Sequence, residues 1–158
     1  MLGKHHLLVF SLVAPMLASA SLCAQSAFPR APAELVGCYN LTLGAWSRPL
    51  GINAGFHALP TTVRLDSAAA TRGGWIVSPD IAYPYPSRFP GMPRWTATQD
   101  SVEILWSNGF QATTLRLARH GTQQLRGQAI VGSDANEFGT DLPRAEIVAR
   151  RIACVRTQ

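Results

Sequence analysis

The sequence has almost no lysine. Of its 14 lysine and arginine residues, one is Lys4 and the other 13 are arginines. A Schiff base, with a carbonyl substrate or with pyridoxal phosphate, requires a lysine amine. Because we expect Lys4 to be removed with a secretory signal, this chemistry is excluded for the mature chain.

The first 24 residues are typical of a cleaved secretory signal. Lys4 and two histidines precede the apolar run LLVFSLVAPMLASA, which is too short to span a membrane and is followed by small residues. We predict cleavage after Ala24, with Ala20 as the alternative, and a mature protein that is periplasmic or secreted. Lipidation of Cys23 is a further alternative, which Leu22 disfavours because a small residue normally stands before the lipidated cysteine.

Sequence motifs of catalysis are also missing. The chain has no Gly-x-Ser-x-Gly turn, no His-Glu-x-x-His pair and no phosphate-binding glycine loop. His57 has no serine, cysteine or carboxylate beside it at a recognisable spacing. We therefore expect that the protein is not an enzyme and has no catalytic residues.

The positive charge of the chain is not clustered. In the mature chain, 13 arginines minus 9 acidic residues give a net charge of +4, and only Arg150 and Arg151 are adjacent. Nucleic-acid-binding surfaces carry their arginines and lysines in a patch or stripe. We therefore expect no nucleic-acid partner.

Cysteine is scarce as well. Cleavage after Ala24 leaves Cys38 and Cys154, an even number, in a compartment where disulfides persist. We predict that they form a disulfide; two buried thiols are the alternative. A metal site is disfavoured, because these cysteines and the two mature histidines, His57 and His120, lack ligand spacing, and we expect no cofactor.

The mature chain lacks sustained helical periodicity. Short alternating apolar and polar runs, separated by Gly, Pro, Asn and Asp, are typical of an all-β protein, and residues 25–158 fit one domain. We predict an antiparallel up-and-down meander of about eight strands that forms a closed or nearly closed barrel. The strands are expected near residues 35–43, 61–66, 74–78, 94–98, 101–106, 110–119, 123–132 and 145–155.

Two turns predict how the strands between residues 101 and 132 pair. Asn108-Gly109 is a preferred type I′ pair that places Ser107 opposite Phe110. A three-residue turn at 120–122 places Arg119 opposite Gln123. Both registers give one apolar inner face, made of Val102, Ile104, Trp106, Thr113, Leu115, Leu117, Leu125, Gly127, Ala129 and Val131.

The outer face of the same strands is polar. In the predicted registers Glu103 lies diagonally across from Arg116, and Arg116 directly faces Arg126. This last pair brings two like charges together, which Glu103 would partly relieve. We expect a solvated outer face.

The first and last strands become neighbours if the barrel closes. In the first strand the odd positions are expected inside: Leu35, Gly37, Tyr39, Leu41 and Leu43. In the last strand either the face with Ile147, Ala149, Arg151, Ala153 and Val155 or the face with Val148, Ile152 and Cys154 points inward. With the first choice, a Cys38–Cys154 disulfide lies outside and the Arg151 guanidinium stacks on Tyr39 and bonds nearby carbonyls.

This pattern resembles the lipocalin-type barrel. That family carries Gly-x-Trp in its first strand and, in its last strand, an arginine packed on the tryptophan. Gly37 and Arg151 match these positions, Tyr39 stands in place of the tryptophan, and no second lipocalin motif lies between them. The resemblance spans the strand pattern of most of the mature chain, and it implies a cup that binds a small apolar molecule.

Aromatic residues gather in two expected connections. Residues 44–60 contain Trp46 and Phe56, and residues 79–95 contain Tyr83 and Tyr85 among five prolines, which favour an extended loop or an edge. The proline-rich segment is either a crossover packed on the barrel wall or a lid over one mouth. We expect ligand contacts from Trp46, Phe56, Tyr83 and Tyr85, with Tyr39 or Arg151 orienting a polar end.

Two functions are consistent with these observations. The first is an exported barrel that binds a small hydrophobic molecule; the alternative is a structural or protein-interaction domain with a side-chain-filled interior and no ligand. The inner face is mixed, because Gly37, Gly127, Ala129 and Ala149 leave room that larger side chains fill elsewhere. We expect no transmembrane segment in the mature chain, and no sequence motif identifies a protein partner.

Overall fold

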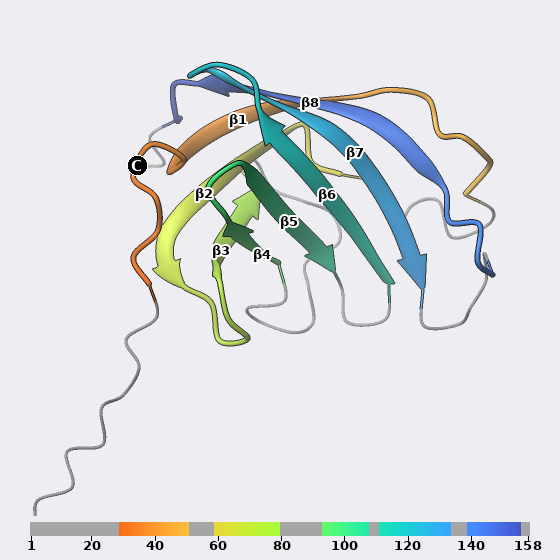
Figure 1. The fold of residues 1–158 in the computed structure, drawn as a ribbon, viewed down its shortest axis with the longest axis horizontal. Coiled ribbons are helices and arrows are strands. Elements are labelled where there is room, and N and C mark those ends of the chain that lie inside the picture. Colours follow the sequence, from red (N-terminus) through yellow and green to blue (C-terminus); the bar gives the residue numbers. More distant parts are fainter. Residues whose placement is uncertain (1–28, 51–58, 80–92, 108–110, 134–138, 156–158) are drawn as a thin grey trace, which may run out of the picture.

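The computed structural model describes residues 29–50, 59–79, 93–107, 111–133 and 139–155 (Figure 1). Several predictions fall outside these residues. They concern the signal segment 1–24, the turn at 108–109 and the side chains of Phe56, His57, Tyr83 and Tyr85.

The chain folds into a closed barrel of antiparallel strands. Each strand pairs with the next in sequence, and the last also pairs with the first. The described ranges contain no helix. The predicted all-β, up-and-down barrel is therefore confirmed. Its strands are β1 Gly37–Leu43, β2 Thr62–Ala69, β3 Trp75–Pro79, β4 Arg94–Ala97, β5 Ser101–Ser107, β6 Gln111–Arg119, β7 Gln124–Ser133 and β8 Arg144–Ile152.

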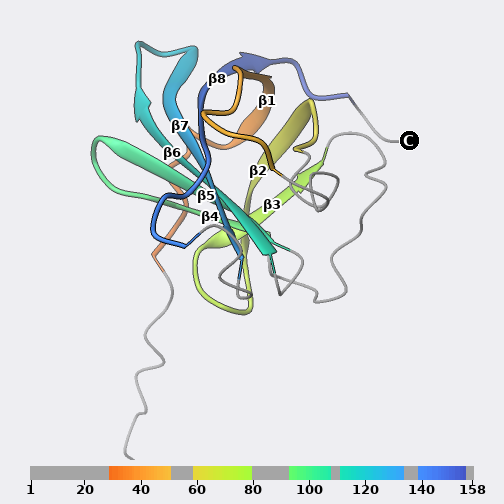
Figure 2. The same ribbon diagram turned by 90° about the vertical axis from the view of Figure 1, so that its right-hand side faces the viewer.

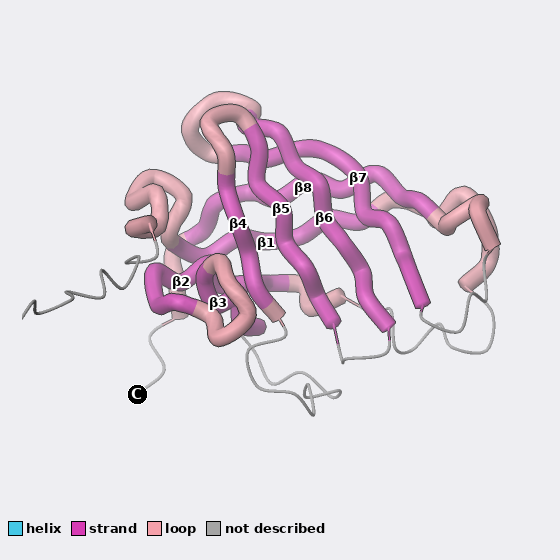
Figure 3. The backbone as a smooth tube through the Cα atoms, turned by 60° about the horizontal axis from the view of Figure 1, so that its bottom comes forward, coloured by secondary structure: helices cyan, strands magenta, loops and turns pink. Residues whose placement is uncertain are grey.

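The strand order gives the barrel two different ends. The β2–β3, β4–β5 and β6–β7 turns lie at one end, together with residues 29–36, and we call this end the base. The last residues of β1, β3, β5 and β7 lie at the opposite end, which we call the rim. Figure 3 shows β4 to β7 side by side between these two ends. No helix within the described residues is long and apolar enough to cross a membrane.

The interior of the barrel is an apolar core. The predicted inner faces of β5, β6 and β7 are confirmed, because Val102, Ile104, Leu115 and Leu117 belong to one buried cluster. Alternate residues of a strand point to opposite faces, so a correct face assignment needs only the correct parity. Large aromatic side chains complete the cluster, with Trp75 and Trp95 packed at 4.7 Å between ring centroids.

The β5–β6 register differs from the prediction by two residues. Ser107 lies opposite Ala112 rather than Phe110, and its hydroxyl donates a hydrogen bond to the carbonyl of Gln111 (3.0 Å). Glu103 consequently lies directly opposite Arg116, with which it forms an ion pair of 3.4 Å. A shift of two residues preserves the side-chain faces, which explains why the core was predicted correctly from a wrong register.

The β6–β7 register is also shifted by two residues. Arg119 lies opposite Leu125 rather than Gln123, because the connecting turn is longer than three residues. Arg116 therefore faces Gln128, and the predicted like-charge pair of Arg116 with Arg126 is wrong. In the observed register these two arginines are not direct cross-strand partners. Arg116 instead faces the carboxylate of Glu103 on β5, which is electrostatically favourable.

Gly127 is required by the close approach of β6 and β7. A Cβ atom at this position would lie 1.9 Å from the carbonyl oxygen of Arg116, a distance that no side chain tolerates. The expectation that Gly127 leaves room in the interior is therefore wrong, because the backbone of β6 occupies that space.

A disulfide between Cys38 and Cys154 closes the seam of β1 and β8 on the outside of the barrel. Figure 2 shows the two strands of this seam side by side. The two Cα atoms are 5.1 Å apart, and the two cysteines are 116 residues apart in the sequence. The predicted disulfide is confirmed. It ties the chain that leaves β8 after Ile152 back to the first strand.

We predict that Cys38 and Cys154 resist thiol alkylation in the denatured protein until a reductant is added. Peptide mapping by mass spectrometry checks this and separates both residues from Cys23. Reduction should lower the free energy of unfolding by about 4–5 kcal/mol, as the chain-entropy model gives for so long a loop. Ready labelling of both cysteines without reductant would contradict the disulfide.

We predict that Leu117→Ala lowers the free energy of unfolding by about 2–5 kcal/mol, because it removes buried methyl groups and leaves a cavity. Arg116→Ala, next to it on the outer face of β6, is the matched control and should cost less than about 1 kcal/mol, since its ion pair is exposed. Urea unfolding measures both. Equal losses would show that the inner and outer faces of β6 are misassigned.

Candidate functional site

The seam between β1 and β8 brings Tyr39 and Arg151 together. The two residues are direct cross-strand partners, and the guanidinium carbon lies 5.5 Å from the centre of the tyrosine ring. This distance allows a cation–π interaction. The structure also decides between the two faces of β8, because Ile147 and Ala149 are buried whereas Ile152 is 37% exposed.

Arg151 also holds the backbone that precedes β1. One terminal nitrogen of its guanidinium donates a hydrogen bond to the carbonyl of Glu34 (2.7 Å), and the other donates to the carbonyl of Val36. A Cβ at Gly37 would lie 2.8 Å from this guanidinium, and the φ of Gly37 is +148°, which side chains rarely adopt. The Gly-x-Tyr motif thus has a physical reason: glycine lets the arginine cross the start of β1.

Residues 29–36 cover the base of the barrel. Ala31 and Leu35 are buried in the core, and the backbone turns at Pro32, whose carbonyl accepts a hydrogen bond from the amide of Leu35 (2.9 Å). The hydroxyl of Tyr39 donates to the carbonyl of Leu35 (2.9 Å), and the indole of Trp75 donates to the carbonyl of Pro29 (3.2 Å). The barrel is therefore closed at the base by its own chain.

An ion pair adds charge to this end. Arg119, at the end of β6, donates a hydrogen bond to the Glu34 carboxylate (2.9 Å). A hydrogen bond from the backbone and the Arg119 guanidinium lower the pKa of Glu34 below its ordinary value. Burial raises the pKa of Tyr39, against the opposing effect of the Arg151 charge, so Tyr39 is a neutral hydrogen-bond donor at physiological pH.

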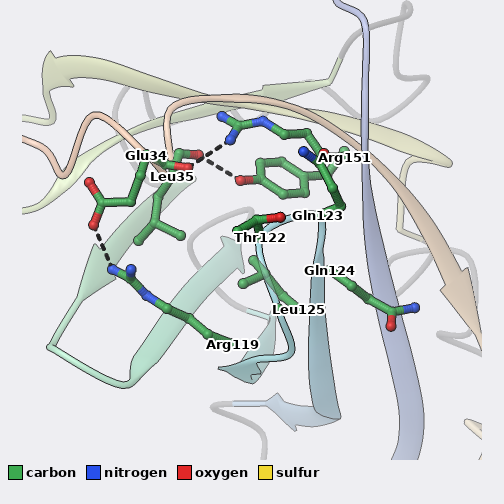
Figure 4. Close-up of a pocket in the computed structure, with 10 residues that line it drawn as sticks. Glu34, Leu35, Arg119, Thr122, Gln123, Gln124, Leu125 and Arg151 are labelled. Atoms are coloured by element: carbon green, nitrogen blue, oxygen red, sulfur yellow. Dashed lines mark hydrogen bonds and ion pairs between the residues drawn. The ribbon is translucent and has the colours of Figure 1, made fainter.

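A pocket of about 250 Å³ lies among these groups, and we call it the base pocket (Figure 4). Its walls come from residues before β1, from β1, from the end of β6, from the β6–β7 turn, from the start of β7 and from β8. Its lining includes Glu34, Leu35, Tyr39, Arg119, Leu125, Arg151 and residues 121–124.

The rim carries partly buried apolar side chains, together with an ion pair of Arg48 with Asp141 (3.5 Å). Residues 44–47 continue beside the start of β8, where the amide of Gly44 donates to the backbone carbonyl of Glu146 (2.8 Å) and the amide of Ser47 donates to that of Arg144 (2.7 Å). This pairing holds Trp46 at the end of β1. Trp46, Leu43 and Leu59 pack against the core while remaining partly exposed.

The structure describes three of the six predicted ligand-binding residues. Tyr39 and Arg151 lie together at the base, whereas Trp46 follows the opposite end of β1, at the rim. Phe56, Tyr83 and Tyr85 lie outside the described residues. Sequence analysis missed Glu34 and Arg119, which are 85 residues apart and carry no motif that links them.

Between the two ends the described interior is filled. Ala129 and Ala149, where the sequence left room, are 0% and 1% exposed, so neighbouring side chains occupy the space beside them. Thr113 is also buried inside, and its hydroxyl has no hydrogen-bond partner among the described residues. In the same residues no group of three or more His, Cys, Asp or Glu is placed to hold a metal ion.

Comparison with known proteins identifies no relative. No protein-family model, no curated protein and no solved structure matches this chain. A function must therefore be inferred from the geometry of the base and of the rim.

We predict that the Glu34–Arg119 ion pair makes stability depend on pH in the acid range. Because the pKa of Glu34 is lower in the folded than in the unfolded protein, its contribution is complete above pH 4.5 and is lost as the pH falls through the folded-state pKa. Urea unfolding of the wild type and of Glu34→Gln should therefore differ at pH 7, and this difference should shrink as the pH falls below 4.5. A difference that stays constant across this range would show that the carboxylate has no such role.

Proposed function

We propose that the protein is an exported, lipocalin-like barrel that binds one small apolar molecule at its rim. An eight-stranded barrel is just wide enough to fill with its own side chains or to hold one small ligand. Since residues 29–36 cover the base, a ligand would enter from the rim. The disulfide supports export, because disulfides persist in oxidising compartments.

The observation that carries the proposal is the presence of partly exposed apolar side chains at the rim. Trp46, Leu43 and Leu59 contact the buried core on one side and solvent on the other. A ligand that covers them gains about 25 cal/mol for each Å² of apolar surface removed from water. Tryptophan offers the largest such surface, and the backbone pairing of residues 44–47 with β8 already fixes its position.

The base supports the lipocalin-like part of the proposal. The family pairs an arginine of the last strand with the aromatic residue of a Gly-x-aromatic motif in the first strand. Arg151 stands in that relation to Tyr39, and Gly37 gives the arginine its path. A rigid, closed base is what a cup needs if its opposite end is to receive ligand.

A structural or protein-interaction domain is the second candidate function. It is favoured by the filled interior, where Ile104, Leu115 and Leu117 are almost completely buried. In that case the apolar rim would contact a protein rather than a small molecule. The two candidates differ in whether small apolar ligands bind saturably.

We predict saturable binding of a long-chain fatty acid or an apolar fluorescent dye, followed by displacement of the dye and by tryptophan fluorescence. Trp46→Ala should weaken binding roughly tenfold, as truncation of an aromatic anchor does. Ile152→Ala, an exposed apolar residue at the base end of β8, is the matched control and should bind as the wild type does. Absence of saturable binding would leave the structural candidate.

The same titration with Tyr83→Ala and Tyr85→Ala tests the contacts expected from the sequence in the proline-rich segment. Weaker binding by these variants would extend the rim site to that segment. Unchanged binding would show that the segment is a crossover rather than a lid, with the rim site limited to Trp46 and its neighbours.

A further inference from the structure

We propose that the base pocket binds a small organic carboxylate. The proposal does not depend on apolar binding at the rim, because it concerns other residues at the opposite end of the barrel. Arg119 is its central residue. The chain supplies a cavity, an unused buried donor, a net positive charge and an apolar wall in one place.

The unused donor is the Nε–H group of Arg119. This nitrogen is buried and has no hydrogen-bond partner among the described residues, while a terminal nitrogen of the same guanidinium bonds Glu34. A buried donor without a partner is costly, and native proteins rarely leave one. A carboxylate oxygen accepts a charge-assisted hydrogen bond from a guanidinium N–H, which is stronger than a bond to a neutral acceptor, so a carboxylate satisfies this group well.

The charges around the pocket favour a monoanion. Arg119 and Arg151 contribute two positive charges and Glu34 one negative charge, which leaves +1. Arg151 already bonds two backbone carbonyls and stacks on Tyr39, so it contributes its field rather than free hydrogen bonds. Phosphate and sulfate are disfavoured because they have no apolar body to cover the apolar part of the lining, which includes Leu35 and Leu125.

The other residues that line the pocket determine which group is attached to the carboxylate of the ligand. Leu35, Leu125 and the ring of Tyr39 provide apolar surface on the inner side of the pocket. The β6–β7 turn provides Thr122 and Gln123 at the exposed edge, beside Arg151, whose amide donates to the carbonyl of Gln123 (2.9 Å) (Figure 4). The ligand is therefore a compact acid with an apolar body, and benzoate is a suitable probe.

The test is a titration of the purified protein with benzoate, followed by the NMR resonances of the arginine Nε–H groups. Arg119→Gln assigns the resonance of Arg119 by its disappearance. We expect that resonance to shift saturably with benzoate and to stay unchanged with inorganic phosphate or chloride at equal ionic strength. A shift of the same size with all three salts would overturn the proposal, because it would show only a general ionic effect.

Two charge variants and a control complete the test, with binding measured by calorimetry. Arg119→Gln should weaken benzoate binding at least about tenfold, and Glu34→Gln should tighten it about two- to fivefold, because a competing exposed carboxylate is removed. Arg116→Gln is the matched control, since Arg116 also lies on β6 and pairs with a carboxylate, and it should bind as the wild type does.

Unchanged affinity in both Arg119→Gln and Glu34→Gln, or an equal loss in Arg116→Gln, would overturn the proposal. If Arg119→Gln fails to fold, Glu34→Gln still decides, because a purely structural ion pair predicts no gain in affinity. Trp46→Ala should leave benzoate binding unchanged. Loss of dye binding at the rim with intact benzoate binding at the base would show that the two sites are separate.

Discussion

The position of Arg151 is the constraint on which the rest of the molecule depends. Its side chain lies across the seam where a meander must join its two ends, stacks on Tyr39 of β1 and bonds the carbonyls of Glu34 and Val36. One guanidinium thus joins the last strand to the first strand and fixes the segment that closes the base. A charged side chain is tolerated there because its donors have partners and its face has an aromatic ring.

The seam is held on both faces of the sheet. Inside the barrel, Arg151 contacts Tyr39; outside, the disulfide of Cys38 and Cys154 joins the same two chain segments. Adjacent residues of a strand point to opposite faces of the sheet. Cys38 and Tyr39 are neighbours in β1, so one forms the link outside the barrel and the other forms the link inside it. Closing the barrel brings together residues more than a hundred positions apart, which costs chain entropy. The Arg151–Tyr39 contact inside and the disulfide outside offset this cost.

The fold followed from the sequence because a period of two residues determines which face of a strand is buried. Eight strands, their order and the inner faces of β5 to β7 were predicted on that basis. The registers were wrong by two residues, since they depend on turn length, and residues such as Asn108-Gly109 favour one turn without enforcing it. The pairing of Glu34 with Arg119 had no local signal at all, because only closure of the barrel brings these residues together.

The two ends of the barrel now differ in chemistry for a structural reason. At the base, residues 29–36 present backbone carbonyls and Glu34, which attract Arg119 and Arg151, so polar groups accumulate there. At the rim, the backbone of residues 44–47 forms hydrogen bonds with β8, and the side chain of Trp46 packs against the core. Between them, buried side chains of the described strands, Ala129 and Ala149 among them, separate the two ends. An apolar ligand at the rim and a carboxylate at the base would therefore bind to one barrel independently. Each would be recognised by the residues at its own end of the barrel.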